Sequence, residues 1–182
     1  MSAGYTDNHN RLQYVTTVDR NSGNRYILGT IKQQTVNLTM RIDYIITPKL
    51  SIRFYGSPFV SRGKYSDFKY ANNTMSKNYN DRFAFYDNTR LVDNRYQLDE
   101  NGDNVPEYSI ANPDFSFRQF RSNLVLKWEY RPGSDIYLVW SSDRTGFVDN
   151  AGTNLGHSLG RLWSIVPRNI FLVKVNYWFS LH

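Results

Sequence analysis

Cysteine is absent from the 182 residues, and so is any apolar run long enough to form a transmembrane helix. The first absence excludes a disulfide framework and a cysteine metal site. The second excludes helical spans, which need about 20 consecutive apolar residues. The net charge is +6, but no cluster of five or more basic residues occurs, and this disfavours nucleic-acid binding.

Aromatic residues, in contrast, are abundant, with 14 Tyr, 11 Phe and 4 Trp making up 16% of the chain. The mean hydropathy is nevertheless -0.59. This combination is typical of strands in which apolar and polar side chains alternate along the chain. The sequence therefore predicts an all-β chain whose residues 1–182 form a single region.

The C-terminal residues 169–182 show this alternation most clearly. One face of the expected strand would carry Phe171, Val173, Val175, Tyr177, Phe179 and Leu181, and the other would carry Leu172, Lys174, Asn176, Trp178 and Ser180. A tilted strand of about ten residues crosses a bilayer, and its lipid-facing side chains must be apolar. The pattern therefore predicts the closing strand of an outer-membrane barrel.

Six segments in all carry strand patterns, namely residues 10–18, 26–46, 50–61, 115–131, 135–146 and 168–181. Their connections alternate in length, with tight turns at 47–49 and 132–134 and long loops at 62–113 and 142–167. This rhythm is typical of an antiparallel up-and-down transmembrane β-barrel with long external loops and short inner turns. We therefore expect the long loops to be extracellular, and the tight turns and the C-terminus to be periplasmic.

Six strands are too few to close a membrane barrel, since the smallest known single-chain barrels have about eight. An unclosed sheet in lipid would leave backbone polar groups without hydrogen-bond partners. The first ten residues have neither the basic start nor the apolar core of a signal peptide. We therefore expect the chain to be the C-terminal portion of a larger barrel. A further hidden pair of strands and closure by several chains are the alternatives.

Two sets of side chains are expected on opposite faces of these strands. The lumen-lining set consists of the charged residues Arg41, Asp43, Arg53, Lys127, Glu129 and Lys174. This set would either select solutes in a pore or form a ladder of paired charges. The aromatic girdle, whose rings would meet the lipid headgroups, consists of Tyr44, Trp128, Tyr130, Trp140 and Tyr177. Aromatic residues of the long loop are candidates for ligand or partner contact: Phe68, Tyr70, Tyr79, Phe83, Phe85 and Tyr86.

Residues 94–108 suggest a hairpin that turns at Asn101-Gly102, a dipeptide that favours a type I′ turn. Around this turn, Asp99, Asn101 and Asp103 place oxygen atoms at alternate positions, as calcium loops do. However, Ile110 occupies the position of the bidentate glutamate that such loops require. The two interpretations are a Ca²⁺ site and a polar hairpin tip without a metal, and no other cofactor is expected.

Local signatures of catalysis are missing from the sequence. There is no nucleophile elbow, dinucleotide fingerprint or phosphate-binding loop. His9, His157 and His182 are too far apart in the sequence to suggest a metal site. We therefore expect no enzyme, with an outer-membrane enzyme whose catalytic residues lie on loops as an alternative.

Residues 26–44, 56–69, 112–134 and 169–179 resemble the C-terminal barrel region of large bacterial envelope proteins. The most specific stretch is Phe117-Arg-Gln-Phe-Arg-Ser-Asn-Leu124. In that family a carbohydrate-binding family 9-like domain precedes a C-terminal domain of unknown function. The resemblance implies an outer-membrane location and no established catalytic chemistry, so it implies no active-site residues.

These patterns together predict an integral outer-membrane β-barrel segment that acts as a surface channel, transporter or envelope-assembly component. Its expected partners are the lipid bilayer and either the remaining strands of a larger barrel or other subunits of an outer-membrane complex. The main alternative is a soluble, secreted β-sheet module that binds carbohydrate or protein.

Overall fold

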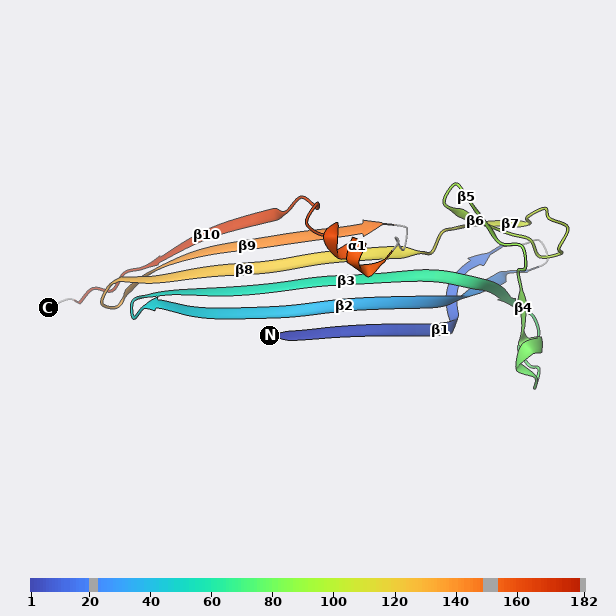
Figure 1. Cartoon of the computed structure of the whole chain (residues 1–182), viewed down its shortest axis with the longest axis horizontal. Helices are drawn as coiled ribbons and strands as arrows, with labels where there is room; N and C mark the ends of the chain where they lie inside the picture. Colours follow the sequence, from blue (N-terminus) through green and yellow to red (C-terminus); the bar gives the residue numbers. More distant parts are fainter. Residues whose placement is uncertain (20–22, 149–153, 181–182) are drawn as a thin grey trace.

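The computed structural model describes residues 1–19, 23–148 and 154–180. Most of them lie in a seven-stranded antiparallel sheet, six of whose strands are long (Figure 1). The long strands pair in the order β1 (Ser2–Val18), β2 (Arg25–Thr47), β3 (Leu50–Ala71), β8 (Phe115–Arg131), β9 (Ser134–Val148) and β10 (Arg168–Asn176). The prediction of an all-β, antiparallel chain is therefore confirmed.

The observed strands are close to the predicted segments but differ at three ends. β1 begins at Ser2, and β3 continues to Ala71, so the irregular part of the long loop starts after residue 71 rather than at 62. The polar residues of this extension stay in the sheet because β2 pairs with them, as Gln34 does with Arg62. β10 ends at Asn176, and Leu181 and His182 lie outside the described residues.

Two tight turns define one end of the sheet, which we call the turn end. Residues 48–49 connect β2 to β3, and residues 132–133 connect β8 to β9. Gly133 follows Pro132 and has a φ of 75°. A type II turn favours proline at its second position and requires a positive φ at its third, so the Pro-Gly pair fits this turn. The chain after β10 packs on this second turn, because the backbone N–H of Trp178 donates to Oγ of Ser134 at 3.0 Å.

The sheet does not close on itself within the described residues. β1 and β10 are its two edges, and no pairing joins them. β1 starts opposite Thr39, so the outer edge of β2 from residue 40 to 47 has no strand beside it in the described part of the chain. No helix among the described residues is long and apolar enough to cross a membrane.

The opposite end of the sheet, the loop end, carries the remaining elements. A second antiparallel sheet consists of β5 (Arg90–Val92), β6 (Arg95–Leu98) and β7 (Tyr108–Ala111). The short strand β4 (Phe83–Phe85) follows the 3-10 helix η1 (Tyr79–Arg82) and pairs with the end of β3. The helix α1 (Leu155–Gly160) lies in the connection between β9 and β10 (Figure 1).

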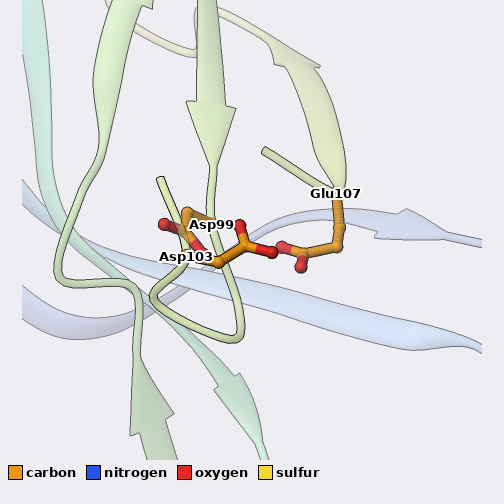
Figure 2. Close-up of side chains that lie close together, drawn as sticks. All are labelled: Asp99, Asp103 and Glu107. Carbon is orange, nitrogen blue, oxygen red and sulfur yellow. The ribbon is translucent and has the colours of Figure 1, made fainter. Parts of the chain in front are cut away.

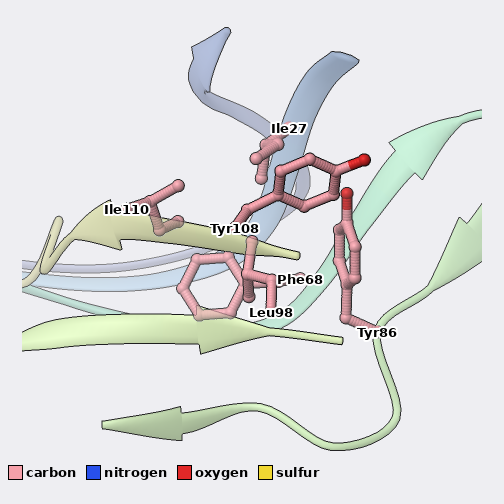
Figure 3. Packing of buried hydrophobic residues seen from close by; sticks show 6 residues of the cluster. All are labelled: Ile27, Phe68, Tyr86, Leu98, Tyr108 and Ile110. Atoms are coloured by element: carbon pink, nitrogen blue, oxygen red, sulfur yellow. The ribbon is translucent and has the colours of Figure 1, made fainter. Parts of the chain in front are cut away.

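A hydrophobic core holds the second sheet to the loop end (Figure 3). Its buried members come from β2, β3, β6, β7 and the residue after β4: Ile27, Phe68, Leu98, Tyr108, Ile110 and Tyr86. The Phe68 and Tyr96 rings lie 4.6 Å apart between centroids. Phe68 and Tyr86 are only 1% and 4% exposed, so the expectation that they contact a ligand is wrong. Their rings are needed inside this core.

Candidate functional site

The register of the strands brings all six predicted lumen-lining residues to one face of the sheet. Asp43 lies opposite Arg53. On the neighbouring row, Lys127 and Lys174 both lie opposite Tyr137. Residues directly opposite one another in an antiparallel pair point to the same side. We call this side the charged face, defined by Arg41, Asp43, Arg53, Lys127, Glu129 and Lys174.

Part of the charged face is compensated by ion pairs. Arg53 Nε lies 3.3 Å from Oδ1 of Asp43, and Lys127 Nζ lies 3.4 Å from Oδ1 of Asp135. The Asp43 and Arg53 side chains are 74% and 75% exposed, and exposed pairs of this kind contribute about 0.2–1 kcal/mol. These contacts resemble the ladder of paired charges, whereas the role of the face in lining a lumen stays a prediction.

The remaining predicted lumen residues make other contacts. The Arg41 guanidinium lies 5.6 Å from the centre of the Tyr55 ring, and Lys174 Nζ lies 5.8 Å from that of Tyr137. Glu129 accepts a hydrogen bond from the backbone N–H of Gly133, at 3.2 Å. Glu129 therefore supports the tight turn, while the two cations are held over aromatic rings.

The opposite side of the sheet carries large apolar side chains at the turn end, and we call it the aromatic face. Two unbroken rows cross five strands: Tyr44, Ile52, Leu126, Leu138 and Val173 in one row, and Ile42, Phe54, Leu124, Trp140 and Phe171 in the next. Phe171 is 75% exposed and Val173 is 65% exposed. No described element covers these rows, so they face whatever surrounds the protein.

The predicted girdle residues belong to this side or border it. Trp140 stacks on Phe171 with ring centroids 6.2 Å apart, on the last apolar row before Ser142. Near the turn end, the Trp128 and Tyr130 rings meet edge to face at 6.2 Å. Tyr177, which follows β10, accepts a hydrogen bond from Arg131 at 3.1 Å. All five girdle residues are exposed, and their contact with lipid headgroups stays a prediction.

Toward the loop end, the aromatic face is covered by the segment that contains α1. Ser158 on α1 lies 3.4 Å from Ser116 on β8, oxygen to oxygen. The Trp163 ring packs on Phe120 with centroids 5.0 Å apart, and its backbone oxygen accepts from Arg144 at 2.9 Å. The exposed apolar rows are therefore confined to the turn-end half of the sheet.

The loop of residues 99–107 between β6 and β7 brings together Asp99, Asp103 and Glu107 (Figure 2). One carboxylate oxygen of each lies within 4.8 Å of the others. The predicted hairpin is confirmed, but its type I′ turn is wrong, because positive φ occurs at Gly102 and Asn104 rather than at Asn101. Sequence reasoning missed Glu107, since a nine-residue loop rather than a two-residue turn brings it to Asp99.

The Asp99 carboxylate is already occupied within this loop. It accepts the backbone N–H groups of Gly102 and Asn104, both at 2.7 Å. Desolvation raises the pKa of the Asp99 carboxyl, but these backbone hydrogen bonds outweigh it and lower the pKa overall. Asn101 and Asp103 bond to each other. Oxygen atoms of this kind can bind Ca²⁺, but the contacts that these oxygens make are hydrogen bonds that shape the loop.

The family model of a domain of unknown function, DUF5916, matches residues 69–181, which is more than half of the chain. The chain belongs to the DUF5916 family. The DUF5916 match begins at the end of β3 and includes the second sheet, β8, β9 and β10. The match confirms the expected domain of unknown function. It says nothing about an outer-membrane barrel or about a carbohydrate-binding family 9-like domain. No curated protein and no solved structure matches the chain.

Proposed function

We propose that this sheet forms part of the wall of a transmembrane β-barrel in a bacterial outer membrane. The barrel acts as a surface channel, transporter or envelope-assembly component, without catalysis. The observation that carries the proposal is the pair of apolar rows that run unbroken across five strands on one face, with six of their ten side chains exposed. No row on the charged face is apolar across all five strands. The long loops are extracellular, and the turn end and the C-terminus are periplasmic.

The exposure of these rows is the physical reason for the proposal. Soluble monomers rarely expose a contiguous apolar patch larger than a few hundred Å². Each Å² of apolar surface removed from water stabilises the protein by about 25 cal/mol. Lipid tails would cover the rows without requiring any side chain to move, whereas water would solvate them poorly.

The lengths of the strands fit the same arrangement. β2 has 23 residues and β3 has 22, while about ten residues suffice for a tilted strand to cross a bilayer. Only about half of each strand can then lie in lipid. The apolar rows occupy the turn-end half, so the loop-end half would extend outside the membrane.

Closure requires partner strands along the turn-end half of β2, the outer edge of β1 and the outer edge of β10. Backbone N–H and C=O groups at these edges would be costly in lipid without hydrogen bonds. The resemblance to large envelope proteins favours further strands of a larger barrel, in a protein that also carries a carbohydrate-binding family 9-like domain. Other outer-membrane subunits are the second possible source.

Cell fractionation of the full-length gene product tests the location. We expect it in the outer-membrane fraction, soluble only in detergent, with a mobility in electrophoresis that changes on heating. A protein that remains monomeric and soluble at high concentration without detergent would contradict the proposal. That result would favour the soluble β-sheet binding module instead.

Conductance across a planar bilayer separates a channel from an assembly component. If the charged face lines an open pore, Arg41→Glu and Arg53→Glu should shift the anion/cation selectivity toward cations. Arg95→Glu on β6, in the second sheet at the loop end, is the matched control for charge reversal. Absence of conductance in the wild-type protein would exclude the channel and leave the assembly role.

A further inference from the structure

The loop-end half of the aromatic face carries basic side chains interspersed with apolar ones. Lys32 lies directly opposite Lys64, and Arg62 lies opposite Ser116. On the neighbouring rows, Arg118 lies opposite Val60 and Arg144 opposite Phe120. The register is unbroken between these rows and the apolar rows, so all point to the same side. Together with Arg161 after α1 we call them the basic belt: Lys32, Arg62, Lys64, Arg118, Arg144 and Arg161.

The basic belt has no ion-pair partner among the described residues, in contrast to the charged face. Like charges directly opposite one another, as in Lys32 and Lys64, destabilise a sheet. The Asp114 carboxylate lies within electrostatic range of Arg62 and Lys64 and offsets part of this repulsion, but it forms no ion pair with either. Asp7 accepts hydrogen bonds from Tyr5 and Gln34, and Asp114 accepts the backbone N–H of Tyr65. An anion from outside the chain would relieve this repulsion.

Arg118 gives the second indication of an anion-binding site. The residue is 8% exposed, and its Nε atom is buried without any hydrogen-bond acceptor. A buried cationic donor without a partner loses its hydration and gains nothing in return. Arg161 lies within electrostatic range of it and adds a like charge. A phosphate group bound between the Arg118 and Arg161 guanidinium groups would supply the counter-charge.

The height of the belt above the turn end fits the surface of a membrane. Ten residues separate Trp128 from Arg118 on β8, which corresponds to about 33 Å along the strand and, at the usual tilt, roughly 25 Å along the membrane normal. The apolar band of an outer-membrane barrel has about that height. Arg118 would then lie where the lipid headgroups of the loop-side leaflet begin. Arg144 lies one row closer to the turn end, and Arg62 and the Lys32–Lys64 pair lie one and two rows further out, so the belt would extend through the headgroup region.

We propose that the basic belt binds the phosphate groups of anionic lipids in the leaflet on the loop side. This inference rests on the proposed membrane function, because it needs the apolar rows to lie in the same bilayer. Arg118 and Arg161 hold one phosphate at the margin of the α1 segment, and Lys32, Lys64 and Arg62 extend the contact across β2 and β3. Arg144 holds the α1 segment in place through the backbone oxygens of Trp163 and Ile165.

The test uses the full-length protein in nanodiscs of neutral phosphatidylcholine, with and without diphosphorylated lipid A, and measures co-purified lipid A by mass spectrometry. We compare Arg118→Gln, and separately the exposed pair Lys32→Gln with Lys64→Gln, with the wild type. Arg121→Gln is the matched control, because Arg121 lies on the same strand but on the other face, paired with Asp143. Lys77→Gln in the loop after β3 controls for the loss of a lysine.

We expect every variant to enter neutral nanodiscs equally well. Retention of lipid A should fall about fivefold for each basic residue removed from the belt and stay unchanged in the controls. Equal retention in belt and control variants would overturn the inference while leaving the membrane proposal intact. Failure of the wild type to enter neutral nanodiscs would overturn both. Millimolar inorganic phosphate that displaces all bound lipid A would indicate a free-anion site and would also overturn it.

Discussion

The two halves of the long sheet differ in how their apolar side chains are buried, although the same strands run through both. At the loop end, apolar side chains are buried between the long strands and the second sheet, as in a soluble protein. At the turn end, comparable side chains form two unbroken rows on one face, whereas the other face mixes charged residues with exposed apolar ones such as Ile45 and Leu172. The proposed function accounts for this difference by placing water around the loop end and lipid around the turn end.

The largest effect is expected in the loop-end core. Phe68→Ala would leave a cavity between β3 and the second sheet and should cost about 3–5 kcal/mol of local stability. Phe85→Ala is the control, because Phe85 is exposed and should change stability by less than about 0.5 kcal/mol. Hydrogen exchange of the β6 and β7 amides measures both. Equal protection in the two variants would show that this end has no independent core.

A charge placed in the turn-end half should have the next largest effect. Leu126→Arg puts a cation into an apolar row, which in lipid costs about 2–4 kcal/mol near the bilayer midplane. Val125→Arg on the same strand faces the other way and should be tolerated. Urea unfolding in lipid vesicles measures the difference. If the two variants have the same stability, the aromatic face does not contact lipid.

Alanine substitutions of two glycines compare how much the turns at the two ends contribute to stability. Gly133→Ala should destabilise by about 1–2 kcal/mol, because φ is positive and a Cβ atom would lie 3.2 Å from Cβ of Trp178. Gly102→Ala also has positive φ, but nothing lies within 4 Å, so backbone strain alone remains. Urea midpoints should fall further for Gly133→Ala. A larger fall for Gly102→Ala would contradict the packing of Trp178 on the turn.

The smallest effect concerns the acidity of the loop between β6 and β7. The folded pKa of Asp99 is lowered, so its stabilising contribution is present above its unfolded value of 3.8 and is lost as the pH falls through the folded value. Proteolysis of residues 99–107 should therefore become faster only below about pH 4. Asp99→Asn should be cleaved faster already at pH 7. Unchanged cleavage of this variant would show that the carboxylate does not hold the loop.

The long strands were predictable because the sequence patterns that specify them lie within each strand and its adjoining turn. Alternation along residues 36–46 and the Pro-Gly turn at 132–133 identify strands and a connection without any knowledge of the fold. The same alternation placed Arg41 and Tyr44 on opposite faces. The register then added what the alternation could not, namely that Tyr44 and Val173 lie in one row across five strands.

Contacts between distant residues were not predictable in this way. Phe68 and Tyr86 look like loop aromatics until Leu98 and Tyr108 pack against them. Glu107 reaches Asp99 only through the long loop. The basic belt was equally hidden, since Lys32 and Lys64 become neighbours only once β2 and β3 are paired. Sequence patterns define faces of single strands, whereas sites that span strands require the register.

Because the chain has no cysteine, a scan of single-cysteine spin labels along β8 tests the central claim most directly. Collision with oxygen reports lipid, and collision with a water-soluble nickel complex reports water. Labels at 124, 126 and 128 should be accessible to oxygen, labels at 123, 125 and 127 to nickel, and the oxygen signal should disappear at 118. Water accessibility at 124, 126 and 128, equal to that of their neighbours, would contradict a lipid-facing aromatic face.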